Sequence, residues 1–361
     1  DWSVTGVQTC ALPICILLAN PRGFCAGVRM AIDVVDQLLD ICHGERVFVF
    51  HEIVHNKHVV NRFRERGVSF VEDLEVVPDG AIVVFSAHGV SPEVRAIAKR
   101  KSLVAIDATC PLVTKVHVEA IRYAKRGMQM LLIGHRDHQE VQGTLGEAPE
   151  MIQVVESPAD IPNLKINDPD KLAYLTQTTL STDDAEVIIR ALQAAFPKIE
   201  APPTSDICYA TTNRQHAVRR IAPDADLLLV IGSKNSSNSK RLTEIARNVG
   251  CPAHLIDDVS ELRAEWFEGV GAVMVTAGAS APEDLVAGLC RELVARFGAT
   301  IEVRNIVDED TEFKMPAALG TMMKARGIDP ATRRLLGMDE ADDRPVYRPV
   351  GCAKCDNQGY K

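Results

Sequence analysis

The amino-acid sequence predicts an α/β protein with mainly parallel sheets. Its 361 residues are enough for two or three domains that each bury a core. Short apolar runs alternate with segments whose apolar residues recur at helical spacing, and this alternation is typical of β–α units that feed a parallel sheet. The runs expected to form buried strands are residues 46–50, 81–86, 103–107, 130–134, 172–177, 227–233 and 272–278.

Three of the turns that follow these strands share one form, at residues 87–98, 232–246 and 278–289. Each offers Ser or Asn as a helix N-cap, and two of them add Pro in the first helical turn. Taken singly, each turn is an ordinary helix start. Taken together, open N–H groups at the carboxyl ends of parallel strands indicate sites for an anion.

Composition narrows the possible partners. The chain is 46% hydrophobic and 25% charged, as in ordinary globular proteins. Its net charge of −9 argues against a nucleic acid or an anionic membrane as the main partner. The sequence has neither an apolar run of the roughly 18 residues that a membrane helix needs nor the basic segment of a signal peptide. Ten cysteines without a secretion signal therefore indicate a reducing, cytoplasmic environment and a metal or catalytic use for some of them.

The two ends differ in character from the rest of the chain. Residues 1–15 contain VTGVQTCALPI, which resembles a translated sequencing adapter, and we expect a non-native leader there. Residues 321–361 are charged and lack strand patterns, and we expect a non-native or disordered tail, whose GCAKCDNQGY offers only two of the four cysteines of a structural zinc site. Between the ends we expect α/β domains at 27–109, 110–206 and 207–320, with 16–26 joining the core.

Three cysteines stand apart from the others. Cys25, Cys110 and Cys208 each lie where a helix is expected to start, so that N–H groups and the helix dipole stabilise a thiolate by about 0.3–1 kcal/mol. Three thiolates do not complete a zinc or ordinary iron–sulfur site, which takes four ligands, and would leave one metal position open. Spacing alone also allows a purely structural role. The remaining internal cysteines, Cys42, Cys251 and Cys290, are expected to be small buried hydrophobes.

Eight motifs in order identify a family. The motifs are NPRGFCAGV, HEIVHN, SAHGVS, DATCPLVTKVH, TQTTLS, DICYATTNRQ, GSKNSSNS and TAGASAP. Across about residues 16–320 the chain resembles the 4-hydroxy-3-methylbut-2-enyl diphosphate reductases, which complete the methylerythritol phosphate route to isoprenoids.

The resemblance implies a fold, a cofactor and a reaction. It implies three similar α/β domains in a trefoil around a central [4Fe–4S] cluster with one iron not bound by cysteine. The reaction implied is a two-electron reductive dehydroxylation that gives isopentenyl and dimethylallyl diphosphate. A reduced flavodoxin or ferredoxin is the implied electron donor.

The resemblance also assigns roles by motif. Cys25, Cys110 and Cys208 become the cluster ligands. His138, Glu140 and Thr178 become the catalytic group, with Glu140 as the proton donor; a raised Glu140 pKa is expected because the dianionic substrate and the anionic cluster disfavour its charge. The implied substrate-binding residues are His55, His88, His138, Thr178, Ser236, Ser237, Asn238 and Ser280.

Two other functions remain open at this point. HEIVH at 51–55 matches the H-E-x-x-H pattern of zinc hydrolases, but that pattern works only on a helix, and a strand is expected to run directly into His51. A non-catalytic iron–sulfur redox sensor could use the same cysteines. Such a sensor would not require the histidine, glutamate and serine residues around an anion.

Overall fold

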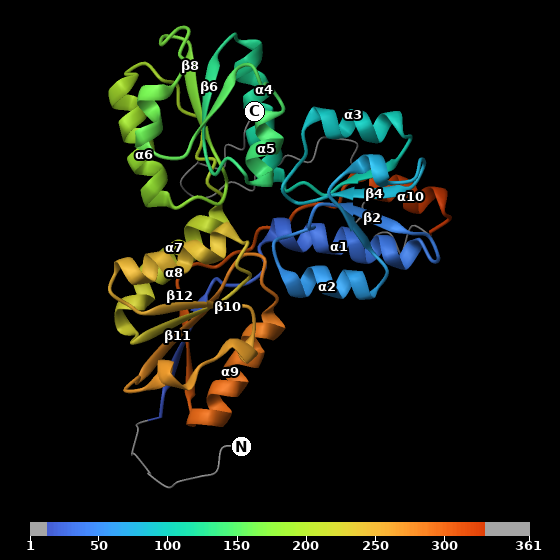
Figure 1. Ribbon diagram of the computed structural model, residues 1–361. Helices are drawn as coiled ribbons and strands as arrows, with labels where there is room; N and C mark the ends of the chain where they lie inside the picture. The colour runs from blue at the N-terminus through green and yellow to red at the C-terminus, as the bar shows by residue number, and fades with distance from the viewer. Residues whose placement is uncertain (1–12, 329–361) are drawn as a thin grey trace. The chain divides into compact units, whose positions relative to one another are not determined.

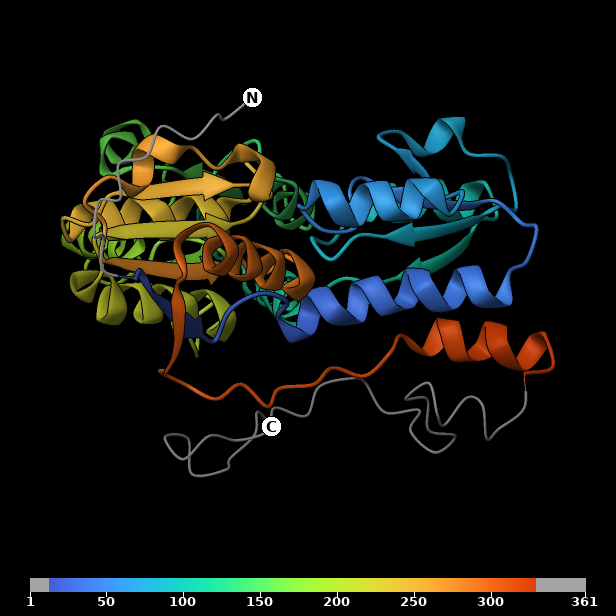
Figure 2. The ribbon, with the colours of Figure 1, turned by 90° about the horizontal axis from the view of Figure 1, so that it is seen from below.

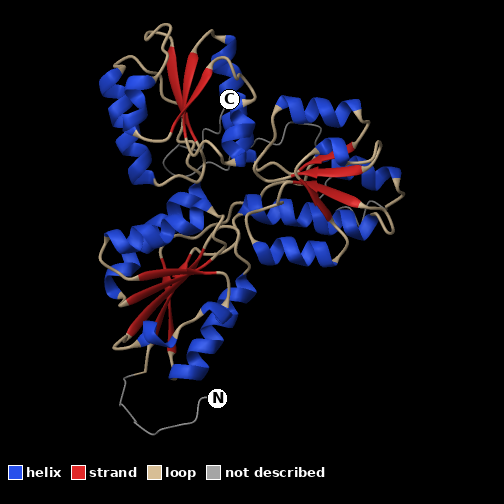
Figure 3. Ribbon diagram, viewed as in Figure 1, coloured by secondary structure: helices blue, strands red, loops and turns tan. Residues whose placement is uncertain are grey.

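The computed structural model describes residues 13–328, and the part of the chain so described is α/β (Figures 1 and 3). The chain divides into two compact units. Unit 1 comprises residues 13–24 and 213–308, and unit 2 comprises residues 25–212 and 309–328. All strand pairs of the named sheets are parallel, which confirms the expected fold class.

Unit 1 contains a five-stranded sheet in the order β10-β9-β11-β1-β12. The strands are β1 (Cys15–Asn20), β9 (Leu227–Ile231), β10 (Ala253–Ile256), β11 (Ala272–Ala277) and β12 (Thr300–Asn305). Because β9 and β11 are buried on both faces, their sequences LLLVI and AVMVTA are continuous apolar runs. The helices of this unit are α8 (Ser237–Asn248), α9 (Glu283–Phe297) and most of α7 (Tyr209–Ile221).

Unit 2 contains two smaller sheets. The first has the order β3-β2-β4-β5 and the second β7-β6-β8. Their strands are β2 (Val47–Phe50), β3 (Ser69–Val71), β4 (Ile82–Phe85), β5 (Val104–Asp107), β6 (Gln129–Ile133), β7 (Ile152–Val155) and β8 (Leu172–Thr176). The helices are α1 (Ala26–Ile41), α2 (Lys57–Glu65), α3 (Pro92–Arg100), α4 (Pro111–Lys125), α5 (Gln139–Leu145), α6 (Thr182–Ala195) and α10 (Ala317–Ala325).

Each expected strand run coincides with a strand, but the expected runs did not include β1, β3, β7, β10 and β12. Two expected helix caps are also confirmed, since Ser91 accepts from Val94 N and Ser236 accepts from Ser239 N. The third is wrong. Helix α9 begins at Glu283 with Pro282 as its N-cap, so Ser280 lies before the helix instead of capping it.

The chain between residues 309 and 328 departs from the expected domain limits. The expected limit at residue 320 falls within α10, which belongs to unit 2 and packs against α1 and β5 (Figure 2). Leu319 and Met323 are buried there, because a nine-residue helix with apolar residues four apart can cover its neighbour. At the other end, Ile14 is already buried and β1 starts at Cys15. The rest of the expected leader and tail, including Cys352 and Cys355, lies outside the described residues.

The helices of the described chain carry no membrane-span signal: within residues 13–328, each is too short or too polar to traverse a bilayer.

Met323→Ala tests whether α10 belongs to the folded body. Removing this fully buried side chain is expected to lower the free energy of unfolding by about 2–5 kcal/mol. Lys324→Ala, at the exposed neighbouring position, is the control and is expected to change it by less than about 0.5 kcal/mol. Equal stability of the two variants in chemical denaturation would contradict the packing of α10.

Candidate active site

The three singled-out cysteines each stand directly before a helix. Cys25 is the N-cap of α1, Cys110 is the N-cap of α4, and Cys208 precedes α7. The expected placement at helix starts is therefore confirmed. All three lie in unit 2 and are half-buried.

The three thiols lie near one another within unit 2. A charge on Cys25 raises the pKa of both Cys110 and Cys208, and a charge on Cys208 raises that of Cys110. The start of α1 also passes very close to Cys110, because a Cβ added to Gly27 would lie 2.5 Å from the Cys110 Sγ. Only glycine fits at this point of α1. Segments far apart in sequence thus bring their thiols to one place.

Burial opposes ionisation of the Cys110 and Cys208 thiols. Burial, with the Cys25 charge, raises the pKa of Cys208 to about 11 and that of Cys110 further, although backbone N–H groups of Leu112, Val113 and Thr211 act in the opposite direction. The expected stabilisation by the helix start is therefore outweighed. A nearby cation would be needed to hold the thiols as thiolates, and metal coordination does this.

The gathered thiols can be compared with the donors that a metal group requires. Across residues 13–328, no three or more His, Cys, Asp or Glu side chains surround a point where one metal ion could bind. A four-iron cluster is larger than one ion and is held by thiols that stand further apart, at its separate iron corners. The three gathered thiols and the missing side chain at Gly27 are compatible with such a group.

Three histidine rings form a second cluster in unit 2. His55 follows β2, His88 follows β4 and His138 follows β6. The ring centroids of His55 and His88 are 4.0 Å apart and stacked, and His138 lies 5.3 Å from His55 and 5.9 Å from His88 in edge-on orientation. The carboxyl ends of parallel strands in two sheets thus supply three imidazoles to one place.

Two of these rings are neutral without a ligand. Burial and the neighbouring His55 lower the pKa of His138 to about 3, and the same causes lower that of His88 well below its usual value. His138 also caps α5, since its Nδ1 accepts a hydrogen bond from Glu140 N at 3.1 Å. Its Nε2 therefore carries the proton and can donate to an anion.

Glu140 forms a buried pair with Thr178. The residue is 2% exposed, and its carboxyl group accepts from Thr178 N at 2.6 Å and from Thr178 Oγ1 at 3.0 Å. Burial is the largest cause that raises its pKa, to about 7, and the charge of Asp206 adds to this while the Thr178 hydrogen bonds lower it. The expected direction of the shift is confirmed, but its main cause here is burial. A carboxyl group with this pKa can give a proton near neutral pH.

The HEIVH segment is not the helix of a zinc hydrolase. Residues 51–56 are non-helical, α2 starts only at Lys57, and His51 has a left-handed backbone with φ of 61°. Its Nδ1 lies 2.5 Å from Glu72 Oε2, whereas His55 Nδ1 lies 3.3 Å from Glu52 Oε2. The two histidines therefore face different carboxylates, as expected for a strand that ends at His51.

Unit 1 carries its own group of candidate residues. Ser236 caps α8, and both amide atoms of the buried Asn238 lack a hydrogen-bond partner among the described residues. Ser239 packs against the turn that contains Ser280. The contact is so close that a Cβ added to Gly278 would overlap Ser239 Oγ. Ser280 is buried and Ser237 half-buried. An unpartnered buried amide next to buried hydroxyls suits a polar ligand.

Sequence reasoning missed several residues that support the site in unit 2. His117 is buried, with Nδ1 2.8 Å from Glu147 Oε1, and lies against Gly89 and Gly143. Lys115 and Asp206 form an ion pair of 2.7 Å. No motif links these partners, and only their positions just after Cys110 and just before Cys208 could have drawn attention to the pair.

The other internal cysteines of the described chain, Cys42, Cys251 and Cys290, are buried as expected.

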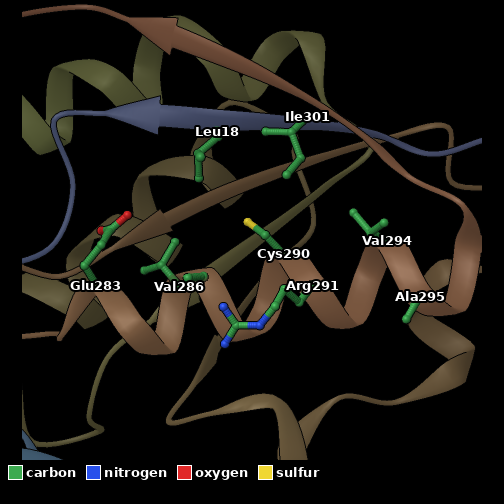
Figure 4. A pocket seen from close by; sticks show the side chains of 9 residues that line it. Leu18, Glu283, Val286, Cys290, Arg291, Val294, Ala295 and Ile301 are labelled. Carbon is green, nitrogen blue, oxygen red and sulfur yellow. The ribbon is translucent and has the colours of Figure 1, made fainter.

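A groove in unit 1 is a separate feature. Figure 4 shows it along α9, with Leu18, Cys290 and Ile301 among its lining residues. Its lining is mainly apolar and includes none of the candidate site residues. The groove is therefore not part of the candidate active site.

Comparison with known proteins places the chain in a family. The model of the LytB protein family matches residues 16–294. The chain is 52% identical over 307 residues to the 4-hydroxy-3-methylbut-2-enyl diphosphate reductase of Rhodopirellula baltica, and the match covers 85% of this chain and 96% of that protein. It is 53% identical over 306 residues to the protein of the same name from Acidithiobacillus ferrooxidans, with coverages of 84% and 96%.

A solved structure is similar as well. The E-1-hydroxy-2-methyl-but-2-enyl-4-diphosphate reductase of Plasmodium falciparum aligns with a TM-score of 0.85 and 41% sequence identity, over 87% of this chain and 99% of that one. By the extent of the family match and by its close relatives, the chain belongs to the LytB protein family.

Proposed function

We propose that this chain is an iron–sulfur reductase that converts 4-hydroxy-3-methylbut-2-enyl diphosphate into isopentenyl and dimethylallyl diphosphate. The observation that carries the proposal is the gathering, within unit 2, of three half-buried thiols from three helix starts, with a buried Glu140–Thr178 pair alongside. Relatives that are about half identical over nearly their whole length bear the name of this reductase, which supports the same reaction here.

The reaction sets three requirements. A C–O bond to the allylic hydroxyl breaks and a C–H bond forms, so two electrons and two protons enter and one water leaves. The protein must therefore hold a source of electrons, supply a proton to the departing hydroxyl, and bind a diphosphate.

The electron source is assigned to a cluster held by the thiols. Cys25, Cys110 and Cys208 would bind a [4Fe–4S] cluster through three of its irons, which leaves one iron without a cysteine ligand. When bound, this group supplies the electrons and a Lewis acid for the substrate oxygen. A reduced flavodoxin or ferredoxin in the cytoplasm is the proposed donor to it.

The proton is assigned to Glu140. Its pKa of about 7 keeps a large fraction protonated at neutral pH, and Thr178 Oγ1 at 3.0 Å can relay the proton from the carboxyl group to the hydroxyl that leaves. His138, whose Nδ1 accepts from Glu140 N, is held beside this pair. These three residues form the proposed catalytic group.

The diphosphate is assigned to histidine, hydroxyl and amide donors. His55, His88 and His138 present their imidazoles at one place, and each hydrogen bond to a charged ligand contributes about 1.5–3 kcal/mol. The same proposal assigns diphosphate contacts to Ser236, Ser237, Asn238 and Ser280 in unit 1. The unpartnered amide of Asn238 supports that assignment.

A non-catalytic iron–sulfur sensor is the second candidate, and it accounts for the thiols but not for Glu140. A sensor has no need for a buried carboxyl group that costs free energy to ionise and that contacts a threonine hydroxyl. An oxygen-free assay with the hydroxylated allylic diphosphate and a chemical reductant separates the two. Formation of both products supports the reductase, and cluster reduction without product supports the sensor.

Glu140→Gln tests the proton donor. The amide keeps the size and a hydrogen bond to Thr178 but cannot give a proton, so turnover is expected to fall by about 10²- to 10⁴-fold. Iron content and diphosphate affinity should stay close to wild type. Retained turnover would assign the proton to another group.

Thr178→Val tests the hydrogen bond that lowers the Glu140 pKa. A raised carboxyl pKa means that the protonated donor is lost as pH rises through about 7, so wild-type turnover should decline above that pH. Loss of the Thr178 hydroxyl should move this decline to higher pH and lower the maximum rate. Thr178→Ser keeps the hydroxyl and is the control. A decline at the same pH in both variants would contradict the assignment.

Binding of inorganic diphosphate should take up protons. Because the pKa of His88 is low in the free protein and an adjacent anion raises it, affinity should increase as the pH is lowered from neutral. Titration calorimetry in two buffers with different ionisation enthalpies measures the uptake. His88→Asn should reduce the proton uptake, and the exposed His43→Asn should not. Binding without proton uptake would contradict protonation of the imidazoles by the bound anion.

A further inference from the structure

A buried ion pair links the segments that carry the reactive groups of unit 2. Lys115 Nζ lies 2.7 Å from Asp206 Oδ1, and the two side chains are 10% and 0% exposed. The ammonium group also donates to Thr204 O at 3.0 Å and to Ser205 O at 3.3 Å. Oxygens of one short segment, residues 204–206, thus surround the lysine, and Glu119 Oε1 of the same helix lies 3.4 Å from Nζ.

Lys115 and Asp206 each lie close in sequence to one of the singled-out cysteines. Lys115 lies in the first turns of α4, which starts directly after Cys110, and Asp206 lies two residues before Cys208. The pair therefore fixes one cysteine segment against the other. The ion pair thus joins two cysteine segments that no covalent bond and no short loop connects.

Asp206 reaches a third segment with its other oxygen. Oδ2 accepts a hydrogen bond from Thr176 N at 2.9 Å, at the end of β8. Two residues later, Thr178 O accepts from Cys208 N at 3.0 Å, and Thr178 itself donates to Glu140. One carboxylate therefore ties the Cys110 helix, the Cys208 segment and the Thr178 turn together.

Stability alone does not account for such a pair. Removing two charges from water is costly, and well-packed apolar residues in place of a buried ion pair often give equal or greater stability. An apolar pair, however, would fix neither the direction nor the register of the three segments. The ion pair therefore serves to fix how the three segments are placed relative to one another.

We propose that Lys115 and Asp206 are positioning residues that hold Cys110, Cys208 and Thr178 in the arrangement that a bound iron–sulfur cluster requires. The inference rests on the proposed function, because it assumes that the cysteines bind a cluster. It assigns to the pair no contact with substrate and no part in electron or proton transfer.

The test compares cluster retention with the stability of the full-length chain. Lys115→Met leaves the buried carboxyl groups of Asp206 and Glu119 without their cation. Lys115→Met with Asp206→Asn removes both charges of the pair and keeps an acceptor for Thr176 N. The rate at which reduced holoprotein loses iron to a chelator is measured without oxygen. The melting temperature is measured on the cluster-free chain. Lys198→Met, which breaks an exposed pair of the same length with Asp170, is the matched control.

The double variant is expected to melt within about 4 °C of wild type, because only Glu119 is left there, and burial, which already raises the pKa of Glu119 to about 7, keeps its carboxyl group protonated once Lys115 is gone. It should nevertheless lose iron about tenfold faster, equivalent to about 1.4 kcal/mol. Lys115→Met should lose iron at least as fast, Lys115→Arg should restore part of the retention, and Lys198→Met should match wild type.

The proposal is overturned if the double variant keeps iron at the wild-type rate. It is also overturned if iron loss only follows the melting temperature across the set, or if the double variant does not fold. Each of these outcomes assigns the pair to the fold alone. Wild-type protein that retains iron but does not reduce the allylic diphosphate would instead contradict the proposed function and leave this inference standing.

Discussion

The parallel direction of the strands is the constraint on which the site depends. In a parallel sheet the carboxyl ends of the strands meet at one edge, and the turns that leave them lie side by side. His55, His88 and His138 follow β2, β4 and β6 in this way, and Thr178 follows β8. Cys110 and Cys25 occupy the equivalent place before α4 and α1. The fold thus gathers polar and sulfur groups without any local cluster in the sequence.

Burial then decides what these groups can do. Burial raises the pKa of the Cys110 and Cys208 thiols and lowers that of the His88 and His138 imidazoles. Glu140 holds its proton to about pH 7. Each of these protonation states suits a site whose ligands are themselves charged. A metal centre compensates thiolates, an anion compensates imidazolium groups, and a departing hydroxyl takes up the proton. The protein is therefore prepared electrostatically for groups that it must bind.

The sequence was informative where periodicity or a motif carried the signal. Runs such as LLLVI predicted buried strands, and glycine-flanked Cys25 and Cys110 before Pro111 predicted helix starts, all of which the structure contains. It failed for edge strands such as β12, whose TIEVRN is largely exposed and lacks a continuous apolar run. It also failed for α10, since the expected limit at 320 ignored the apolar positions Leu319 and Met323.

Contacts between distant side chains could not be predicted in the same way. Lys115 and Asp206 are charged residues that would ordinarily be expected at the surface, and only the folded chain shows that they meet in its interior. The burial of Glu140 likewise depends on how α5 packs beside the turn that follows β8, so its pKa was predicted in direction but for a different main cause. Motifs identify which residues react, and packing determines their charge.

The central claim, that three distant thiols hold one inorganic cluster, is tested most directly by iron and sulfide analysis of protein purified without oxygen. We expect about four irons and four sulfides per chain in the wild type. Each single change of Cys25, Cys110 or Cys208 to Ser should lower both contents sharply, whereas the same change at the buried Cys251 should not. Wild-type protein without iron, or variants that retain the full cluster, would contradict the account.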